Sequence, residues 1–370
     1  MLRIKKLTVL AVGLLFIGTA LFGLNNADAQ ETLKTEKSAT PTPTPTPEVI
    51  EEDSEVLNID TEVVNVLFTA QDRNRRLLTN LKQGDVKLIE DGQEQEITAF
   101  TTQVDLPLSL AILIDTSSSQ ERTLPDEKKA AKSFIQSVIR PLKDEVAIVS
   151  FTGETTLEQG MTNNLARLNR AVDKVEFVPP SGYLGGGVVV GGTPSISGDN
   201  QAIAGSTAIW DAVWITADEV LGKSPDKTRR AVILLTDGDD TFSRKTFAEA
   251  IDKALKAEAV IYCIGVGDPF VTTQYRNGIN EKSLRQIAQR TGGSAFFPRD
   301  ESELRKAFNQ IQVEMRSQYL IAYSPTNQKR DGSYRKIEIQ VANPNLSKQK
   351  VALTHRRGYF AKTESGLKPK

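Results

Sequence analysis

The sequence predicts an α/β protein with a doubly wound, mainly parallel sheet and a small β-module formed by the segments that flank it. Between residues 108 and 315, continuous apolar runs such as LSLAILID alternate with amphipathic helical segments. Strands covered by helices on both faces need apolar residues on both faces, and strand–helix alternation is typical of parallel sheets built from crossover units. On both sides of this region the pattern is that of β-strands alone.

The elements of the α/β region follow from apolar periodicity and from helix start and stop signals. The first helix has Pro125 in its first turn, where the missing N–H costs nothing. We expect the domain at residues 106–317, with strands at 108–115, 145–151, 230–238, 259–267 and 294–298, and helices at 125–140, 165–175, 208–221, 246–258, 281–291 and 301–315.

The flanking segments are β-rich and short. Residues 61–72 alternate as a half-buried strand, and residues 84–100 read as short strands joined by Asp91-Gly92, a strong tight-turn signal. After residue 318 three more strand-like runs follow. Because so small a segment buries little core alone, we expect residues 58–105 to pair with residues 318–362 in one β-module.

The N-terminus has the features of an export signal. Basic residues, an apolar run and Ala27-Asp28-Ala29 predict a signal peptide at residues 1–29; a retained membrane anchor is the alternative. Alternating Thr-Pro favours an extended conformation. We therefore expect a secreted, periplasmic or cell-envelope protein without a stable transmembrane helix after cleavage, with a disordered linker at residues 30–57 and a tail at 363–370.

Composition excludes some functions. Without its signal the chain has 43 basic and 46 acidic residues, so it offers no basic field for nucleic acid. The single cysteine, Cys263, lies in an apolar run and is expected to be a buried core residue.

Polar side chains follow two of the predicted parallel strands. Asp115, Ser117 and Ser119 come after the first strand, Asp237 ends another, and Thr207 lies on the loop that enters a helix. In open α/β sheets, ligands bind beyond the carboxyl ends of the strands. Carboxylate and hydroxyl oxygens, without Cys or His, suit Mg²⁺ or Mn²⁺ better than zinc. The spacing therefore predicts a divalent-cation site, with a degenerate site of caps and turns as the alternative.

Asp115-Thr116-Ser117-Ser118-Ser119, with Thr207 and Asp237, resembles the complete metal-ion-dependent adhesion site (MIDAS) of von Willebrand factor type A (VWA) domains. The resemblance covers residues 108–315 and implies a Rossmann-like VWA fold. The flanks LIEDGQEQEI and QYLIAYSP further resemble the VWFA-related proteins described from acidobacteria.

The resemblance implies a role for each matching residue. The hydroxyls of Ser117, Ser119 and Thr207 would ligate the metal directly, and Asp115 and Asp237 would hold it largely through water. A cation with few direct negative ligands stays electrophilic, so an open position can accept an Asp or Glu side chain of a protein partner.

Residues around this site are candidates for contact with the partner. The segment 181–206 is long and glycine-rich before Thr207, and reads either as a disordered insertion or as a loop that contacts the partner. Asp239 and Asp240 read as an outer acidic ring, or as a solvated turn with a helix N-cap. The candidate partner-binding residues are Tyr183, Gly205, Ser206, Asp239 and Asp240.

The sequence favours a binding module over an enzyme. Serine catalysis needs a base, and the sole histidine, His355, is expected on the surface of a strand far along the chain. No G-x-S-x-G elbow is present. We therefore expect an exported, adhesion-type module that is not an enzyme; a scaffold that keeps the fold without using metal is the alternative, and a hydrolase is a weaker one.

Overall fold

The computed structural model describes residues 62–102, 105–179, 205–225, 228–267 and 278–363, and the backbone of residues 183–185 and 188–189. All of these residues belong to one compact unit, Ile59–Lys370. The expected signal peptide and linker, and residues 364–370 of the expected tail, lie outside the described residues. Among the described residues, no helix is both long and apolar enough to cross a membrane.

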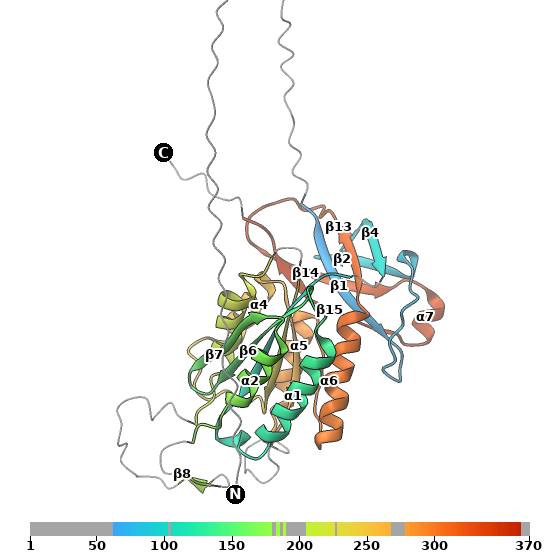
Figure 1. Ribbon diagram of the computed structural model, residues 1–370. Helices are drawn as coiled ribbons and strands as arrows, with labels where there is room; N and C mark the ends of the chain where they lie inside the picture. Colours follow the sequence, from blue (N-terminus) through green and yellow to red (C-terminus); the bar gives the residue numbers. More distant parts are fainter. Residues whose placement is uncertain are drawn as a thin grey trace, which may run out of the picture. The chain divides into compact units, whose positions relative to one another are not determined.

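The expected doubly wound sheet is confirmed. Five parallel strands and one antiparallel edge strand form it in the order β12-β11-β10-β5-β6-β7. Figure 1 labels its strands β6 and β7 and the helices around them. Every residue of β5 and β10 is buried, as their apolar runs predicted. The strands are β5 (Leu108–Asp115), β6 (Glu145–Phe151), β7 (Thr155–Thr162), β10 (Arg229–Thr236), β11 (Ala259–Gly265) and β12 (Ala295–Phe296).

Two helical layers cover the two faces of this sheet. Leu110, Ile112 and Ile114 of β5 pack toward one layer, and Ala111 and Leu113, which point the opposite way, pack toward the other. The first layer contains α1 (Leu124–Val138), α2 (Leu165–Lys174) and α6 (Glu301–Arg316). The second contains α3 (Ile209–Ile215), α4 (Phe247–Lys256) and α5 (Glu281–Thr291).

Several details differ from the sequence-based expectation. The helix expected at residues 208–221 is α3 followed by a π-helical segment, η4 (Thr216–Leu221). The antiparallel strand β7 and the short helix α7 (Pro344–Lys348) were not expected, because TTLEQGMT lacks clear alternation and a five-residue helix has no periodicity. Cys263 is buried, as expected. Two short strands, β8 (Tyr183–Gly185) and β9 (Val188–Val189), pair in the glycine-rich segment.

The two flanks form the β-module together, as expected, but in two four-stranded sheets. Their orders are β15-β1-β13-β4 and β16-β14-β2-β3, so both sheets combine strands from the two ends of the domain. Asp91 and Gly92 have φ of 46° and 88° and form the tight turn between β2 and β3. The strands are β1 (Val64–Gln71), β2 (Val86–Glu90), β3 (Gln93–Gln95), β4 (Ile97–Thr102), β13 (Tyr319–Tyr323), β14 (Tyr334–Val341), β15 (Ala352–His355) and β16 (Gly358–Phe360).

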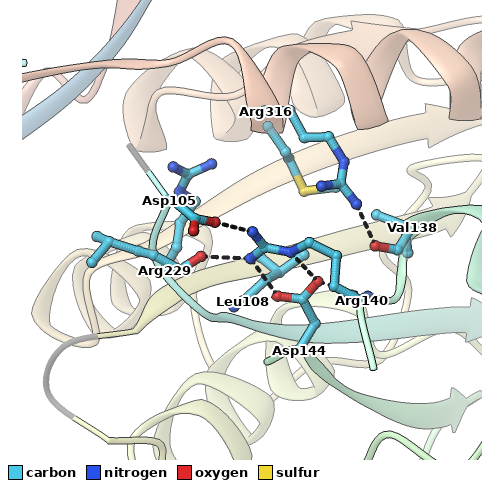
Figure 2. Close-up of a pocket in the computed structure, with 9 residues that line it drawn as sticks. Asp105, Leu108, Val138, Arg140, Asp144, Arg229 and Arg316 are labelled. Atoms are coloured by element: carbon cyan, nitrogen blue, oxygen red, sulfur yellow. Dashed lines mark hydrogen bonds and ion pairs between the residues drawn. The ribbon is translucent and has the colours of Figure 1, made fainter. Parts of the chain in front are cut away.

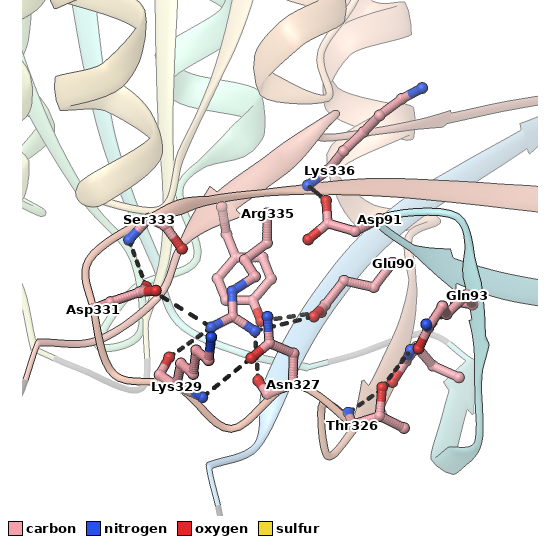
Figure 3. A network of polar contacts seen from close by, with 12 residues as sticks. Glu90, Asp91, Gln93, Thr326, Asn327, Lys329, Asp331, Ser333, Arg335 and Lys336 are labelled. Atoms are coloured by element: carbon pink, nitrogen blue, oxygen red, sulfur yellow. Dashed lines mark hydrogen bonds and ion pairs between the residues drawn. The ribbon is translucent and has the colours of Figure 1, made fainter.

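A buried ion pair ties the second of these sheets to the loop after β13. Arg335 donates to Glu90 Oε1 at 3.4 Å and to the carbonyl oxygens of Asn327 and Lys329. The hydroxyls of Tyr323 and Tyr359 donate to Glu90 Oε2 at 2.5 and 3.1 Å. Figure 3 shows the Arg335 guanidinium enclosed by this loop. Both charges are therefore buried and paired with each other and with further polar groups, although Arg335 Nε has no hydrogen-bond partner.

The last helix of the α/β domain is bonded to the β-module. The carboxylate of Glu314 in α6 accepts from Gln71 Nε2 of β1 at 2.9 Å and from Ser294 Oγ at 2.8 Å. β13 begins three residues after α6 ends. The helix, the sheet edge at β12 and the β-module therefore meet at one buried carboxylate.

The position of His355 differs from our expectation. We expected it on the surface of a strand, but its side chain is 2% exposed. Its Nε2 accepts from the N–H of Ile339 at 3.1 Å, and its Nδ1 lies 2.7 Å from the carbonyl oxygen of Arg356, to which it donates. Burial lowers its pKa. The alternating pattern correctly predicted a strand here. The face of that strand that carries His355 is covered by β14.

Candidate metal centre

Asp115 is the last residue of β5 and lies at the carboxyl end of the sheet. Its side chain is fully buried. Oδ1 accepts from the N–H of Ser117 at 2.9 Å, and Oδ2 accepts from Thr236 Oγ1 at 2.6 Å. Because Thr236 ends β10, which is the parallel neighbour of β5, the carboxylate is fixed between the ends of two strands.

The hydroxyls of Ser117 and Ser119 lie together next to this carboxylate. Their Oγ atoms are 3.2 Å apart. Ser118 to Gln120 form a single 3-10 turn, which directs residues 117 and 119 to one side. The Ser118 hydroxyl between them instead donates to the carbonyl oxygen of Gly205 at 3.2 Å. The alternation expected from the D-x-S-x-S spacing is therefore present in the turn.

Asp237 brings the second carboxylate to the same place. It is 3% exposed, and the Ser119 hydroxyl and the Gln120 amide hydrogen-bond to it. The next residue, Gly238, has a φ of 81°, and a Cβ there would lie 2.8 Å from Leu284 Cγ. Only glycine fits this turn without displacing α5, so the D-G pair sets the direction of the Asp237 side chain.

Thr207 lies on the loop before α3, which is hydrogen-bonded to the loop after β5 and to the loop after β10. Its side chain is buried. Its N–H donates to Thr241 Oγ1 at 2.9 Å, and its carbonyl oxygen accepts from the N–H groups of Thr241 and Phe242. Together with the bond from Ser118 to Gly205, these contacts place Thr207 at the same end of the sheet as the two aspartates.

The environment of the two carboxylates raises the pKa of both. Burial, and then the nearby charge of Asp237, raise the pKa of Asp115 to about 7. Burial also raises the pKa of Asp237 to about 6, although hydrogen bonds from Ser119 and the backbone of Asp239 oppose the rise. Two acids held close together in a site without solvent are costly to ionise.

This donor set fits a hard divalent cation. The groups that donate to Asp115 and Asp237 are hydroxyls, backbone N–H groups and an amide, all of them neutral. A cation would compensate two buried negative charges, and hydroxyl and carboxylate oxygens are the ligands that Mg²⁺ and Mn²⁺ prefer. Among the described residues, no group of three or more His, Cys, Asp or Glu side chains is arranged to hold a metal, so a site here needs the serine and threonine hydroxyls.

The candidate partner-binding residues have different environments. Asp240 caps α3: its Oδ1 accepts from the N–H of Ile209 at 2.8 Å and from Ser243 Oγ. Asp239 and Ser206 are half-buried, as is Gly205, whose φ is 81°. The side chain of Tyr183 lies outside the described residues. Asp240 thus has a structural role in addition to the one expected of it.

Three polar residues near the centre were missed by the sequence analysis. Gln120 is buried and donates to the carbonyl oxygen of Val266, which follows β11. The Thr236 hydroxyl donates to the Asp115 carboxylate. Because Thr236 directly precedes Asp237 at the end of a strand, its position next to the site could have been predicted. Glu127, in the first turn of α1, is buried, and neither carboxylate oxygen has a hydrogen-bond partner. The nearby Thr123 hydroxyl donates to Gln120 Oε1 at 2.8 Å instead.

The comparison with protein families agrees with this geometry. Residues 108–188 and residues 196–310 match two family models, each described as a von Willebrand factor type A domain. The chain therefore carries a VWA domain, built on the six-stranded sheet, and the expected fold class is confirmed. No curated protein matches the chain.

Several solved structures are similar to the chain. A von Willebrand factor type A protein from Catenulispora acidiphila is 15% identical, with a TM-score of 0.43, over 83% of this chain and 76% of its own. BatB from Bacteroides thetaiotaomicron is 18% identical, with a TM-score of 0.42, over 57% of this chain and 100% of its own. Proximal thread matrix protein 1 from the mussel byssus, with a zinc-occupied MIDAS motif, is 21% identical, with a TM-score of 0.42, over 61% of this chain and 50% of its own.

Proposed function

We propose that this protein is an exported, metal-dependent binding module that holds an acidic residue of a protein partner at the carboxyl end of its VWA sheet. The observation that supports this most is the cluster of two buried carboxylates, Asp115 and Asp237, with the paired hydroxyls of Ser117 and Ser119. Mg²⁺ or Mn²⁺ is the proposed ion, and Thr207 completes the proposed set of ligands.

The residues of the site have separate tasks in this proposal. Ser117, Ser119 and Thr207 offer neutral oxygens, while Asp115 and Asp237 supply the negative charge that retains the ion. When bound, the ion supplies an electrophilic position that can take a carboxylate oxygen from the partner. Gly205, Ser206, Asp239, Tyr183 and Asp240 are the proposed contacts to the partner.

The proposal makes the protein a binder and not an enzyme. VWA domains are typically binding modules without catalytic activity. Both ring nitrogens of the sole histidine, His355, are bonded to backbone groups of the β-module, so a serine–histidine pair with Ser117 is disfavoured. A secreted or cell-envelope location, and membership of the acidobacterial type of VWFA-related proteins, are part of the same proposal and rest on the sequence alone.

Metal binding is tested by calorimetry and thermal unfolding of the mature chain with Mg²⁺ or Mn²⁺. An ion at a hundredfold excess over its dissociation constant stabilises a protein by about 2.7 kcal/mol. We expect the unfolding temperature to rise in wild type and in Ser118→Ala, the matched control, whose hydroxyl bonds to Gly205. Ser117→Ala and Asp237→Asn should lose the response.

The outcomes separate the candidate functions. A wild-type chain that does not respond to millimolar cation is a scaffold without a metal site, and the proposal fails. If metal binds, partners are recovered from the source organism's extracellular fraction in Mg²⁺ and in EDTA. Equal recovery in both would show that binding does not pass through the metal.

A further inference from the structure

Gln120 is a fully buried polar residue beside the candidate metal centre. It ends the 3-10 turn that carries Ser119. Glutamine side chains mostly lie on protein surfaces, and a buried amide without hydrogen-bond partners is costly. The position of the Gln120 side chain is therefore set by the groups that it contacts inside the domain.

The side chain of Gln120 joins the ends of three neighbouring strands. It comes from the loop after β5. Its Nε2 donates to the carbonyl oxygen of Val266, which follows β11, at 3.2 Å, and the amide also hydrogen-bonds to the carboxylate of Asp237, which follows β10. The N–H of Val266 donates in turn to the carbonyl oxygen of Thr236 at 3.1 Å. The ends of β5, β10 and β11 are thus connected through one side chain.

The orientation of this amide is fixed by Thr123. Gln120 Oε1 accepts from Thr123 Oγ1 at 2.8 Å, and the N–H of Thr123 donates to the backbone carbonyl oxygen of Gln120 at 3.2 Å. A glutamine amide has one acceptor oxygen and two N–H donors. Because Thr123 uses the acceptor, both donors are left for Val266 and for the metal centre, where Ser119 Oγ lies 3.3 Å from Nε2.

The contact from Gln120 to Asp237 differs from the other contacts of this carboxylate. The N–H of Asp239 donates to Asp237 Oδ1 at 3.0 Å, but it belongs to the same loop. Ser119 comes from the loop after β5, but it is itself a proposed ligand, and its oxygen would also have to serve an ion. The N–H groups of Gln120 are donors only and cannot bind a cation. The amide therefore links the loop after β5 to Asp237 in a way that an ion does not replace.

The opposite end of the sheet provides a contrast. The buried Asp144, which precedes β6, accepts from Arg140 Nε at 2.8 Å and from Arg140 Nη2 at 2.7 Å. Figure 2 shows the guanidinium facing this carboxylate. There a cation of the protein itself compensates the acid. The Gln120 amide is neutral, so it fixes the position of Asp237 without compensating its charge, and the charge is left for an ion.

We propose that Gln120 is a positioning residue of the metal centre. Its amide holds the Asp237 carboxylate beside the Ser119 hydroxyl before an ion binds, so that oxygens from two different loops are already together. An ion then binds without first having to order these side chains, and such ordering weakens binding. This role rests on the proposed function, because it concerns the residues that would bind the ion.

The test replaces Gln120 by methionine, which has a similar length and no N–H donor. Loss of a group that orients a metal ligand typically lowers metal affinity by about 10- to 100-fold, so calorimetry should show Mn²⁺ binding to Gln120→Met that is weaker by at least about tenfold. Gln136→Met, at an exposed glutamine of α1, is the matched control and should bind like wild type. If wild type binds Mn²⁺ and Gln120→Met binds it equally well, Gln120 has no positioning role. If wild type does not bind Mn²⁺, the proposed function fails as well.

Measurements in EDTA separate positioning from a purely structural role. The amide of Asp239 donates to Asp237 Oδ1, so it should exchange faster with solvent in Gln120→Met, because the Asp237 side chain is no longer fixed. The amide of Ser117, which donates to Asp115 Oδ1 at 2.9 Å, should keep its protection. An equal change at both amides, or no change at either, would mean that Gln120 acts on stability alone and overturns the proposal.

A second variant tests the orientation of the amide. Thr123→Val leaves Gln120 Oε1 without its donor, so it should weaken Mn²⁺ binding, by a smaller factor than Gln120→Met. Since Thr123 acts through Gln120, the double variant should bind no more weakly than Gln120→Met alone, and additive losses would contradict this order of action. If Gln120→Met fails to fold, Thr123→Val decides the matter, and a wild-type affinity in that variant refutes the positioning role.

Discussion

At the scale of single residues, Glu127 shows the cost of a buried acid. Burial raises its pKa to about 8, and the charges of Asp115 and Asp237 add to the rise. In the folded protein Glu127 is therefore a neutral acid at neutral pH. An ordinary glutamate in the unfolded chain releases its proton near pH 4.5, so folding is coupled to proton uptake here.

The sign of this coupling gives a prediction. Because the folded pKa is raised, the stabilisation is fully present below about pH 4.5 and is lost as the pH rises toward 8. Glu127→Gln keeps the shape and removes the titration, so it should be more stable than wild type at pH 7, by on the order of 3 kcal/mol. The measurement is urea unfolding between pH 4.5 and 9 in EDTA.

The matched control for Glu127 is Asp126→Asn. Asp126 is the neighbouring acid in the same helical turn, and it is exposed. Its substitution should shift stability little at any pH. If the curves of wild type and Glu127→Gln run parallel across this range, Glu127 is ionised in the folded protein and the reasoning is wrong.

At the scale of elements, the Glu90–Arg335 pair joins β2, β14 and the loop after β13. Side chains of both residues are 2% exposed or less. The desolvation cost of such a pair is met only if every partner is present, and removal of one charge leaves the other buried and uncompensated. Arg335 is also the donor to the Asn327 and Lys329 carbonyl oxygens, so the loop depends on it (Figure 3).

We predict that Glu90→Gln destabilises the protein by about 3–5 kcal/mol, since Arg335 then keeps its charge without a carboxylate. The double variant Glu90→Gln with Arg335→Met should recover part of this loss. Urea unfolding of the wild type, both single variants and the double variant forms a complete cycle. A coupling energy near zero would mean that the pair does not act as a unit.

At the scale of the whole molecule, the β-module is built from both flanks. β13 lies between β1 and β4, and β14 lies between β16 and β2. Phe68 and Tyr319 stack with their ring centroids 4.9 Å apart, although they are far apart in sequence. The core of the module therefore exists only when residues 62–102 and residues 318–360 are both present.

A shortened chain that begins at Asp105 should fail to fold its C-terminal strands. Tyr319, Ile321 and Ile337 would lose the strands that bury them, and exposed apolar edges pair with other chains. We expect aggregation in size-exclusion chromatography. A chain that begins at Glu62 should remain monodisperse with an unchanged unfolding temperature. A monodisperse chain from Asp105 would show that the VWA domain tolerates unpaired flanks.

The sequence by itself determined the five parallel strands, most helices and the main members of the candidate metal site. Short apolar runs such as residues 110–114 and 231–235 are typical of strands covered on both faces. Polar residues that follow such strands meet at one edge because parallel strands end together. Asp115, Ser117, Ser119 and Asp237 were therefore predictable as neighbours. The position of Thr207 at this end of the sheet was predictable because the residue lies just before α3.

Only the tertiary structure decided what depends on contacts between distant segments. β7 carries no clear alternation, because it is a half-exposed edge strand. His355 and Glu127 look like ordinary polar residues in sequence, and their burial is decided by β14 and by the packing of α1. A cavity lined by Leu67, Leu320 and Val260 forms where β1 and β13 approach β10 and β11. No local pattern predicts this approach, because the pattern of one element shows which of its faces is buried and not which element covers that face.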